Sequence, residues 1–350
     1  MSEQESPQPN PSFGLVDSQK ESNIGDEKEK GISPEEVRKQ LDQNTISKYQ
    51  RLLDVINSSL KNDKISQEQY NQSIANIDHL SEKELGFKVT EKYTSQEKAK
   101  EIMGKYYLGS EAVEKAFGIK LEINEIPAIP FSMGELEKAK KLGQFLVLRV
   151  NSGPDGQPLT MQSMNNLLKE RYEKDSSKVL YNIDWYEKEE FFTNETPKLT
   201  WALTSKEVIP NSTDKNYLEQ IDAIVDYLNQ ISPEGLPEEY QKAVEEYKNQ
   251  RAEIEPLIDS DWEKAAGMLE ELKITELTRQ SPAEALYDLV LYFQTNGEKL
   301  LPNRYICTKR RASDGKLVNV GGFGSGGVCV YSNEPDYSRG FLGTSFSRSQ

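Results

Sequence analysis

The feature that most constrains the fold is a change of sequence pattern at Asn296-Gly297. Before it, apolar residues recur mainly at helical spacing. The last helical segment opens with an N-cap serine at Ser281, a proline at the first helical position and a glutamate at the third. After it, the chain consists of short β-prone segments separated by glycines. A helical N-terminal region followed by a mixed domain that ends in short strands predicts the α+β class.

Composition divides the chain into three regions. Residues 1–32 are rich in Ser, Pro, Gln, Glu and Lys and have few apolar side chains to bury, so we predict a disordered tail. Residues 33–117 are charged and carry an apolar stripe, which predicts a helical region. Residues 118–350 are predicted to form a mixed domain with a helical insertion at about 233–275. A capping box, Ser260-Asp261-Trp262-Glu263, is predicted to open a helix in this insertion.

Local patterns predict individual elements within the mixed domain. The stretch 119–132 alternates and carries two prolines, which is typical of an edge strand or an extended segment. A further capping box begins at Ser132. Two apolar runs predict strands and two other runs predict helices: strands at 143–150 and 199–205, and helices at 160–172 and 216–230.

The scarcity of histidine and cysteine excludes many familiar catalytic sites. His79 is the only histidine, so Ser-His-Asp or Cys-His catalysis and multi-histidine metal sites would all need this one side chain. Its helical context indicates a solvated surface residue. Cys307 and Cys329 are too few for a disulfide framework or a Cys-only zinc site. We expect two reduced thiols, with a single disulfide as the alternative, and we predict no enzymatic activity, cofactor or metal.

The charge distribution narrows the choice of partner. The chain carries a net charge of −15, yet residues 301–350 carry seven basic and three acidic side chains. This acidity argues against nonspecific binding to nucleic acid. No run of 18 apolar residues predicts a membrane span, and the N-terminal sequence lacks the pattern of a secretory signal. We therefore expect a cytoplasmic protein whose partner is another protein or a small ligand, with neither nucleic acid nor membrane.

Two motifs near the C-terminus each have two interpretations. Gly322, Gly324 and Gly327 match the spacing of a dinucleotide-binding loop, but a strand-like segment follows them where that loop requires a helix. Tight turns with positive φ are the preferred explanation for these glycines. The basic triplet at 309–311 could bind a phosphate or carboxylate, or it could form the solvated end of a hairpin.

Two stretches carry a resemblance to a known family. The run from Arg279 to Asp288 resembles a helix start in C-type-lectin-like domains of the formylglycine-generating-enzyme type. The ending, from Leu301–Thr308 to Leu342–Arg348, resembles the short strands and glycine turns that close such domains, with Cys307 at the place of the usual tryptophan. This resemblance implies a C-type-lectin-like fold for 118–350. The reactive cysteine pair of the enzymes is not reproduced. Residues 100–350 are also similar to uncharacterised proteins of uncultivated bacteria.

The resemblance implies a second possibility, that of a variable protein of a diversity-generating retroelement. Such elements scramble adenines in AAC and AAT codons, which then never encode Glu, Lys, Gln, Met or Trp. These five types make up 102 of the 350 residues, so about eight would be expected in a 28-residue window. The window from Asn319 to Phe346 holds one, Glu334. The alternative is that a glycine-rich region of strands and turns has this composition for structural reasons alone.

The same region has the composition of an antibody-like binding surface. Tyrosine supplies rigid amphipathic contact area, while serine and asparagine supply adaptable hydrogen bonds. We therefore predict a noncatalytic binding protein that contacts its partner through about 305–346. The alternative is a helical scaffold that works through 33–117 and 216–275. The candidate ligand-binding residues are Arg310, Arg311, Asn319, Ser325, Cys329, Tyr331, Ser332, Asn333, Tyr337, Ser338, Arg339 and Phe341.

Overall fold

The computed structural model describes residues 34–174 and 177–349. By internal contacts the chain divides into two units, Met1–Gln40 and Leu41–Gln350. Of the first unit, the described residues 34–40 form the start of helix α1. The tail predicted at 1–32 lies outside the described residues.

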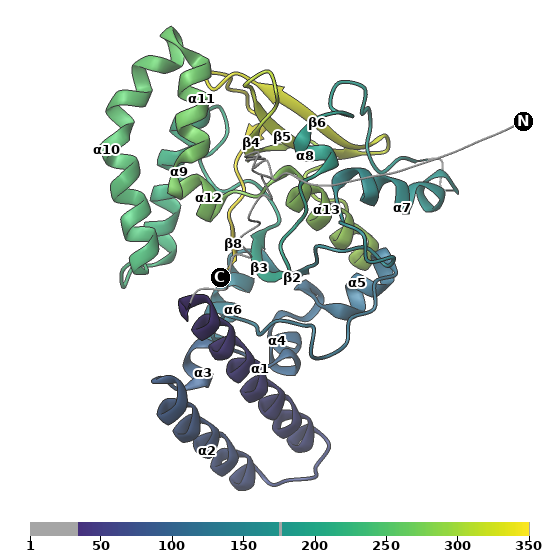
Figure 1. Ribbon diagram of the computed structural model, residues 1–350, viewed down its shortest axis with the longest axis vertical. Coiled ribbons are helices and arrows are strands. Elements are labelled where there is room, and N and C mark those ends of the chain that lie inside the picture. Colours follow the sequence, from purple (N-terminus) through teal and green to yellow (C-terminus); the bar gives the residue numbers. More distant parts are fainter. Residues whose placement is uncertain (1–33, 175–176, 350) are drawn as a thin grey trace, which may run out of the picture. The chain divides into compact units, whose positions relative to one another are not determined.

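Helices and strands are both present in the second unit, as the α+β prediction requires (Figure 1). The helices are α1 (Pro34–Lys61), α2 (Gln67–Leu85), α3 (Val89–Lys92), α4 (Gln96–Met103), η1 (Gly104–Tyr106), α5 (Ser110–Phe117), α6 (Met133–Lys141), α7 (Met161–Lys174), α8 (Glu190–Thr193), α9 (Tyr217–Ile231), α10 (Glu238–Ser260), α11 (Trp262–Glu271), α12 (Lys273–Thr278) and α13 (Pro282–Asn296). The strands are β1 (Tyr107–Leu108), β2 (Gln144–Arg149), β3 (Thr200–Ser205), β4 (Tyr305–Arg311), β5 (Leu317–Gly324), β6 (Gly327–Asn333), β7 (Leu342–Gly343) and β8 (Ser347–Ser349).

The strands form two four-stranded sheets. The first has the order β1-β2-β3-β8, in which only the β1–β2 pair is parallel. The second has the order β6-β5-β4-β7, in which β4 and β7 are parallel and the other pairs antiparallel. The last strand, β8, therefore returns from the second sheet region to the first.

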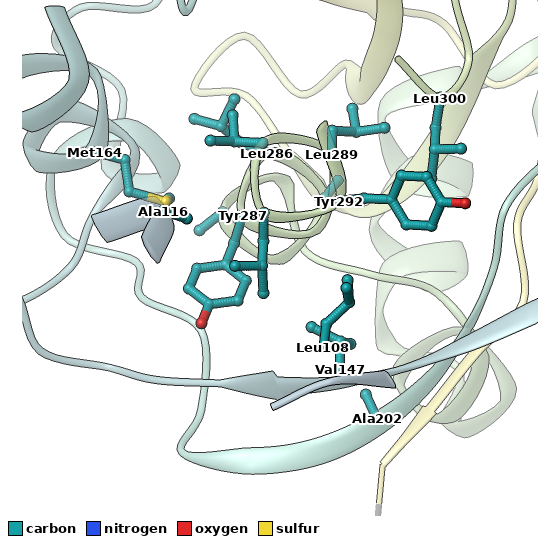
Figure 2. Packing of buried hydrophobic residues seen from close by; sticks show 14 of the residues in the cluster. Leu108, Ala116, Val147, Met164, Ala202, Leu286, Tyr287, Leu289, Tyr292 and Leu300 are labelled. Carbon is teal, nitrogen blue, oxygen red and sulfur yellow. The ribbon is translucent and has the colours of Figure 1, made fainter. Parts of the chain in front are cut away.

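Helix α13 lies at the centre of the largest core. Its residues from Pro282 to Tyr292 are all buried, as expected for a helix that is covered on every side. The Tyr287 hydroxyl of this helix donates to the Leu148 carbonyl of β2 at 2.8 Å, and the Tyr292 ring lies 5.2 Å from that of Phe145 in β2. In Figure 2 the Tyr292 ring lies beside Leu300, and Leu286 and Leu289 lie on the side of the helix away from the strands. The capping box predicted at Ser281 begins this helix, and Gly297 ends it in the left-handed conformation.

A buried ionic network ties α13 to the first sheet. Arg149 of β2 is 2% exposed, and its guanidinium donates to the Asp288 carboxylate at 2.6 and 3.1 Å. Its Nη1 also lies 3.3 Å from Glu284, which Lys309 of β4 approaches at 3.6 Å. Burial alone would raise the pKa of Glu284, but Arg149 and Lys309, together with the Ser281 backbone amide and Lys198, outweigh it, so the pKa of this carboxyl is lowered. The carboxylate therefore stays ionised between the two sheets.

Helices α9 to α12 form a second core against one end of the second sheet. Figure 1 shows α9, α10 and α11 as neighbouring helices beside β4. Cys307 of β4 and Leu317 of β5 pack into this core together with Phe346. The helices α9 to α12 thus cover part of one sheet face and leave the rest of that face uncovered.

Most of the predicted local elements are confirmed. Strands β2 and β3, helices α7 and α9 and the capping boxes at Ser132 and Ser281 form where expected. The stretch 119–132 makes no named strand and contributes one isolated bridge, between Thr94 and Ile129. The capping box at 260–263 is wrong by one residue. Ser260 is the last residue of α10, and Asp261 caps α11 by accepting from the Lys264 amide.

The predicted division at residue 118 does not match the packing. Ala99, Val113 and Phe117 belong to the same core as β2, β3 and α13. In the structure β1 pairs with β2, and α5 packs on α13. Short amphipathic helices cannot bury an apolar stripe by themselves, so they join the larger core. Residues 99–117 therefore belong structurally with the chain that follows them.

Candidate binding cavity

The two-residue alternation of β4, β5 and β6 gives their sheet two different faces. Val318 and Val320 point into the core around α13. On the other face, the register aligns Cys307, Asn319 and Tyr331 in one row. The neighbouring row consists of Tyr305, Gly321 and Cys329. Only the Cys307 side of this face is covered by the helical layer, so the rest carries a cavity.

This aromatic cavity has a volume of about 540 Å³. It lies between the loop before β4, the open face of β5 and β6, and the segment that connects β6 to β7. Six of the predicted ligand-binding residues are brought together here: Asn319, Tyr331, Ser332, Asn333, Tyr337 and Phe341. The other lining residues are Pro302, Asn303, Tyr305, Gly322 and Leu342. No lining residue carries a charged side chain.

Aromatic rings form much of the cavity wall. The ring of Tyr305 lies 5.6 Å from that of Tyr331 and 5.8 Å from that of Phe341, measured between centroids. Tyr331 and Phe341 are 47% and 43% exposed, so their faces are available to a partner. The Arg339 guanidinium, which does not line the cavity, lies over the ring of the lining residue Tyr337 at 4.8 Å, a cation–π contact. Such a wall offers large contact area at a low entropy cost.

Asn319 is the unusual member of the lining. It is 2% exposed, and neither its Oδ1 nor its Nδ2 has a hydrogen-bond partner in the described chain. A buried polar group left unpaired costs about 1–3 kcal/mol of folding free energy. This amide therefore destabilises the protein where it stands, and buried polar groups of this kind call for an explanation.

Gly322 leaves the space that the Tyr305 ring occupies. Gly322 has φ +55°, and a Cβ at this position would collide with the Tyr305 hydroxyl. Burial, followed by the hydrogen bond to the Cys329 thiol, raises the pKa of Tyr305. The phenol therefore stays protonated at neutral pH, and the wall that it forms stays uncharged.

The glycine motif serves turns and close contacts, as preferred from the sequence. Gly322 and Gly327 have positive φ, whereas Gly324 does not. The motif is followed by β6 and not by a helix, which removes the geometry that a dinucleotide-binding loop needs. Ser325 lies at the exposed turn between β5 and β6, away from the cavity lining.

The structure places two predicted arginines outside the cavity. Arg310 donates to Glu195 at 2.8 Å and Arg311 donates to Glu270 at 2.7 Å. Lys309, which precedes them, is nearly buried beside Glu276. The basic triplet is therefore neither a solvated hairpin end nor an open anion site, because acidic side chains from distant segments already pair with it.

The remaining predicted residues lie beside the cavity. Ser338 and Arg339 follow Tyr337 in the segment before β7, and Arg339 is exposed. Cys329 lies in the row of Tyr305, underneath the lining. Both cysteines are free thiols, so the alternative of a disulfide between them is wrong. Burial raises the pKa of Cys307 to about 11.

Sequence reasoning missed Tyr305 as a site residue. No local pattern singles it out, because its place in the cavity depends on the pairing of β4 with β5, which aligns Tyr305 with Gly321. Sequence reasoning also missed two exposed aromatics beside the edge strand. Trp185 donates its indole N–H to the Val330 carbonyl of β6 at 3.2 Å, and the ring of Tyr181 packs near Gly326.

Three further observations concern histidine, metal ligands and membrane-spanning helices. His79 is exposed on α2, as predicted. Within 34–174 and 177–349, no group of three or more His, Cys, Asp or Glu side chains could hold a metal ion. In the same residues, no helix combines the length and apolar character needed to cross a bilayer. No protein-family model, curated protein or solved structure matches the chain.

Proposed function

We propose that this chain is a noncatalytic binding protein whose ligand, or a side chain of whose protein partner, enters the aromatic cavity. The observation that carries this proposal is the convergence of six residues, selected from composition alone, on one concave lining. Cavities with aromatic walls and a few convergent polar groups are the usual form of a ligand site. The exposed rings of Tyr331 and Phe341 provide the anchors that binding surfaces favour.

Fragment binding tests this proposal. The probes are phenol, indole and benzamide, followed by ligand-observed NMR with the full chain. Tyr331→Ala is expected to weaken their binding at least about tenfold, which corresponds to about 1.4 kcal/mol. The matched control is Tyr70→Ala, which removes a tyrosine from α2, far from the lining. Binding that is absent, or equal in both variants, would contradict a ligand site in this cavity.

A finer proposal is that the region from about 118 is a C-type-lectin-like domain and a retroelement target. Its support is the composition of 319–346 together with the position of Asn319, Tyr331 and Asn333 in the cavity lining. The test is to sequence several kilobases around the gene. The proposal expects a reverse-transcriptase gene and a near-copy of codons 305–346 that differs only opposite adenines. If neither is present, the retroelement proposal fails, because nothing would then generate the composition of 319–346 by diversification.

A second candidate is the helical scaffold, which one observation favours. Leu52 and Val55 of α1 and Leu80 of α2 are exposed large apolar side chains. A partner helix could cover such positions. The double substitution Leu52→Glu/Val55→Glu is expected to abolish co-purification of a partner if the scaffold is the function, and Leu167→Glu on α7 is the control. Tyr331→Ala would then leave co-purification unchanged.

A further inference from the structure

We propose that the aromatic cavity recognises an uncharged group that carries a planar amide, and that Asn319 both donates to and accepts from this amide. This inference rests on the proposed function and adds the chemical class of the ligand. It covers a small molecule with a carboxamide or lactam, and equally a carboxamide side chain of a peptide, since both present the same hydrogen-bonding edge.

Two other buried carboxamides, those of Gln50 and Gln280, have both a donor and an acceptor partner. The Gln50 side chain donates to the Ile129 carbonyl and accepts from the Ile129 amide, both at 3.1 Å. It thus binds one residue's backbone polar groups in both directions. Gln280 donates to Asp288 at 2.7 Å and accepts from Ser345 at 2.7 Å. Asn319 is equally buried but has neither interaction.

The position of Asn319 supports the same class of ligand. It lines the cavity, and its neighbours in the row are Cys307 and Tyr331. An orphan amide elsewhere in the core would only lower stability. Both amide atoms of Asn319 are covered in the free protein, so its side chain must turn toward the cavity before it pairs with a ligand; that pairing then relieves the cost of the unpaired groups.

The donor and acceptor atoms of Asn319 restrict the chemistry of the ligand. An asparagine amide has an acceptor oxygen and a donor nitrogen side by side. A carboxylate can only accept and an ammonium can only donate, so each would leave one side of Asn319 unpaired. The lining also holds no charged side chain that could compensate an ionised ligand. A neutral amide satisfies both sides and needs no counter-charge.

The shape of the aromatic wall suits a flat ligand. The rings of Tyr305, Tyr331 and Phe341 form a wall on which a flat group can stack. Asn303, Ser332 and Asn333 add polar groups to the rest of the lining. A conjugated amide is flat. Its apolar face can stack on the aromatic wall while its polar edge pairs with Asn319.

The experiment compares three probes of similar size: benzamide, benzoate and toluene. Each is titrated into the full chain and followed by protein-observed NMR. Benzamide is expected to bind at least about tenfold more tightly than toluene or benzoate, since one bidentate amide contact discriminates by this amount or more. Competition of benzamide by N-acetyl-asparagine methylamide then distinguishes a peptide side chain from a free small molecule as the source of the amide.

Two variants assign the preference to Asn319. Asn319→Leu has a similar volume and is expected to remove the preference for benzamide while toluene still binds. Asn319→Asp cannot donate when ionised and is expected to lose benzamide affinity about tenfold or more. Preserved resonance dispersion in the NMR spectrum shows that each variant is folded.

Two outcomes would overturn the inference, and they are distinguishable. If all three probes bind the wild type with equal affinity, or if Asn319→Leu keeps the preference for benzamide, the amide inference fails while the cavity remains a ligand site. If no probe perturbs resonances of the cavity residues, the proposed function fails as well.

Discussion

Replacing Asn319 by leucine should make the protein more stable, although it alters a predicted binding residue. Both polar atoms of this side chain are buried without a partner, and each such group costs about 1–3 kcal/mol. Leucine has a similar volume but is not planar, and an imperfect fit costs about 1 kcal/mol. The expected net effect is a gain of about 1–5 kcal/mol in the free energy of unfolding.

The matched control is Gln50→Met, which removes a buried amide that is fully paired. It leaves the Ile129 amide and the Thr94 carbonyl without the Gln50 partner, while the Ile129 carbonyl keeps the hydrogen bond from the Thr94 amide at 3.4 Å. This substitution should therefore lower the free energy of unfolding by about 1–3 kcal/mol. The two amide-to-apolar changes thus have opposite signs because only one amide is satisfied.

Urea unfolding followed by circular dichroism measures both effects. The midpoint should rise for Asn319→Leu and fall for Gln50→Met, with an unchanged slope in each case. A fall of the Asn319→Leu midpoint comparable to that of Gln50→Met would refute the reasoning, because it would mean that the Asn319 amide is satisfied in the folded protein. A gain in stability combined with a loss of binding is the pattern that binding sites commonly show.

Three further predictions concern the surroundings of the cavity. Gly322→Ala should lower the free energy of unfolding by about 1–3 kcal/mol, because the residue has φ +55° and faces a tyrosine hydroxyl; urea unfolding tests this, and an unchanged midpoint would contradict it. Thiol titration of the native protein at pH 8 should label Cys329 first, because Cys307 is buried and its pKa is raised to about 11; equal labelling rates would disprove the placement. The pKa of Glu284 is lowered in the folded protein, mainly by Arg149 against the effect of burial. Its contribution to stability is therefore complete above the pKa of the unfolded chain, about 4.3, and is lost as the pH falls below that value. Glu284→Gln should make the urea midpoint depend less on pH between pH 6 and pH 3. A midpoint that changes with pH as it does in the wild type would exclude this role.

Local signals in the sequence were sufficient for many elements of the fold. The capping boxes at Ser132 and Ser281 and the apolar run of β2 depend on residues a few positions apart. Such short-range patterns act through backbone geometry that the segment itself supplies. For the same reason, the tyrosines, serines and asparagines of 319–341 could be selected as a group from composition. The failed capping box at Ser260 shows the limit, since α10 continues through that residue.

Tertiary structure alone decided which of these residues form a site. Arg310 and Glu195 are 115 positions apart, and Arg311 and Glu270 are 41 apart; no local pattern shows that these charges neutralise each other. Tyr305 enters the cavity only because β4 aligns it with Gly321. The sequence by itself therefore determined the helices, the strands and the chemistry available near the C-terminus. Long-range pairing and packing determined which side chains are consumed inside the protein and which remain free to bind, because those contacts join segments whose separation along the chain carries no information about their distance in space.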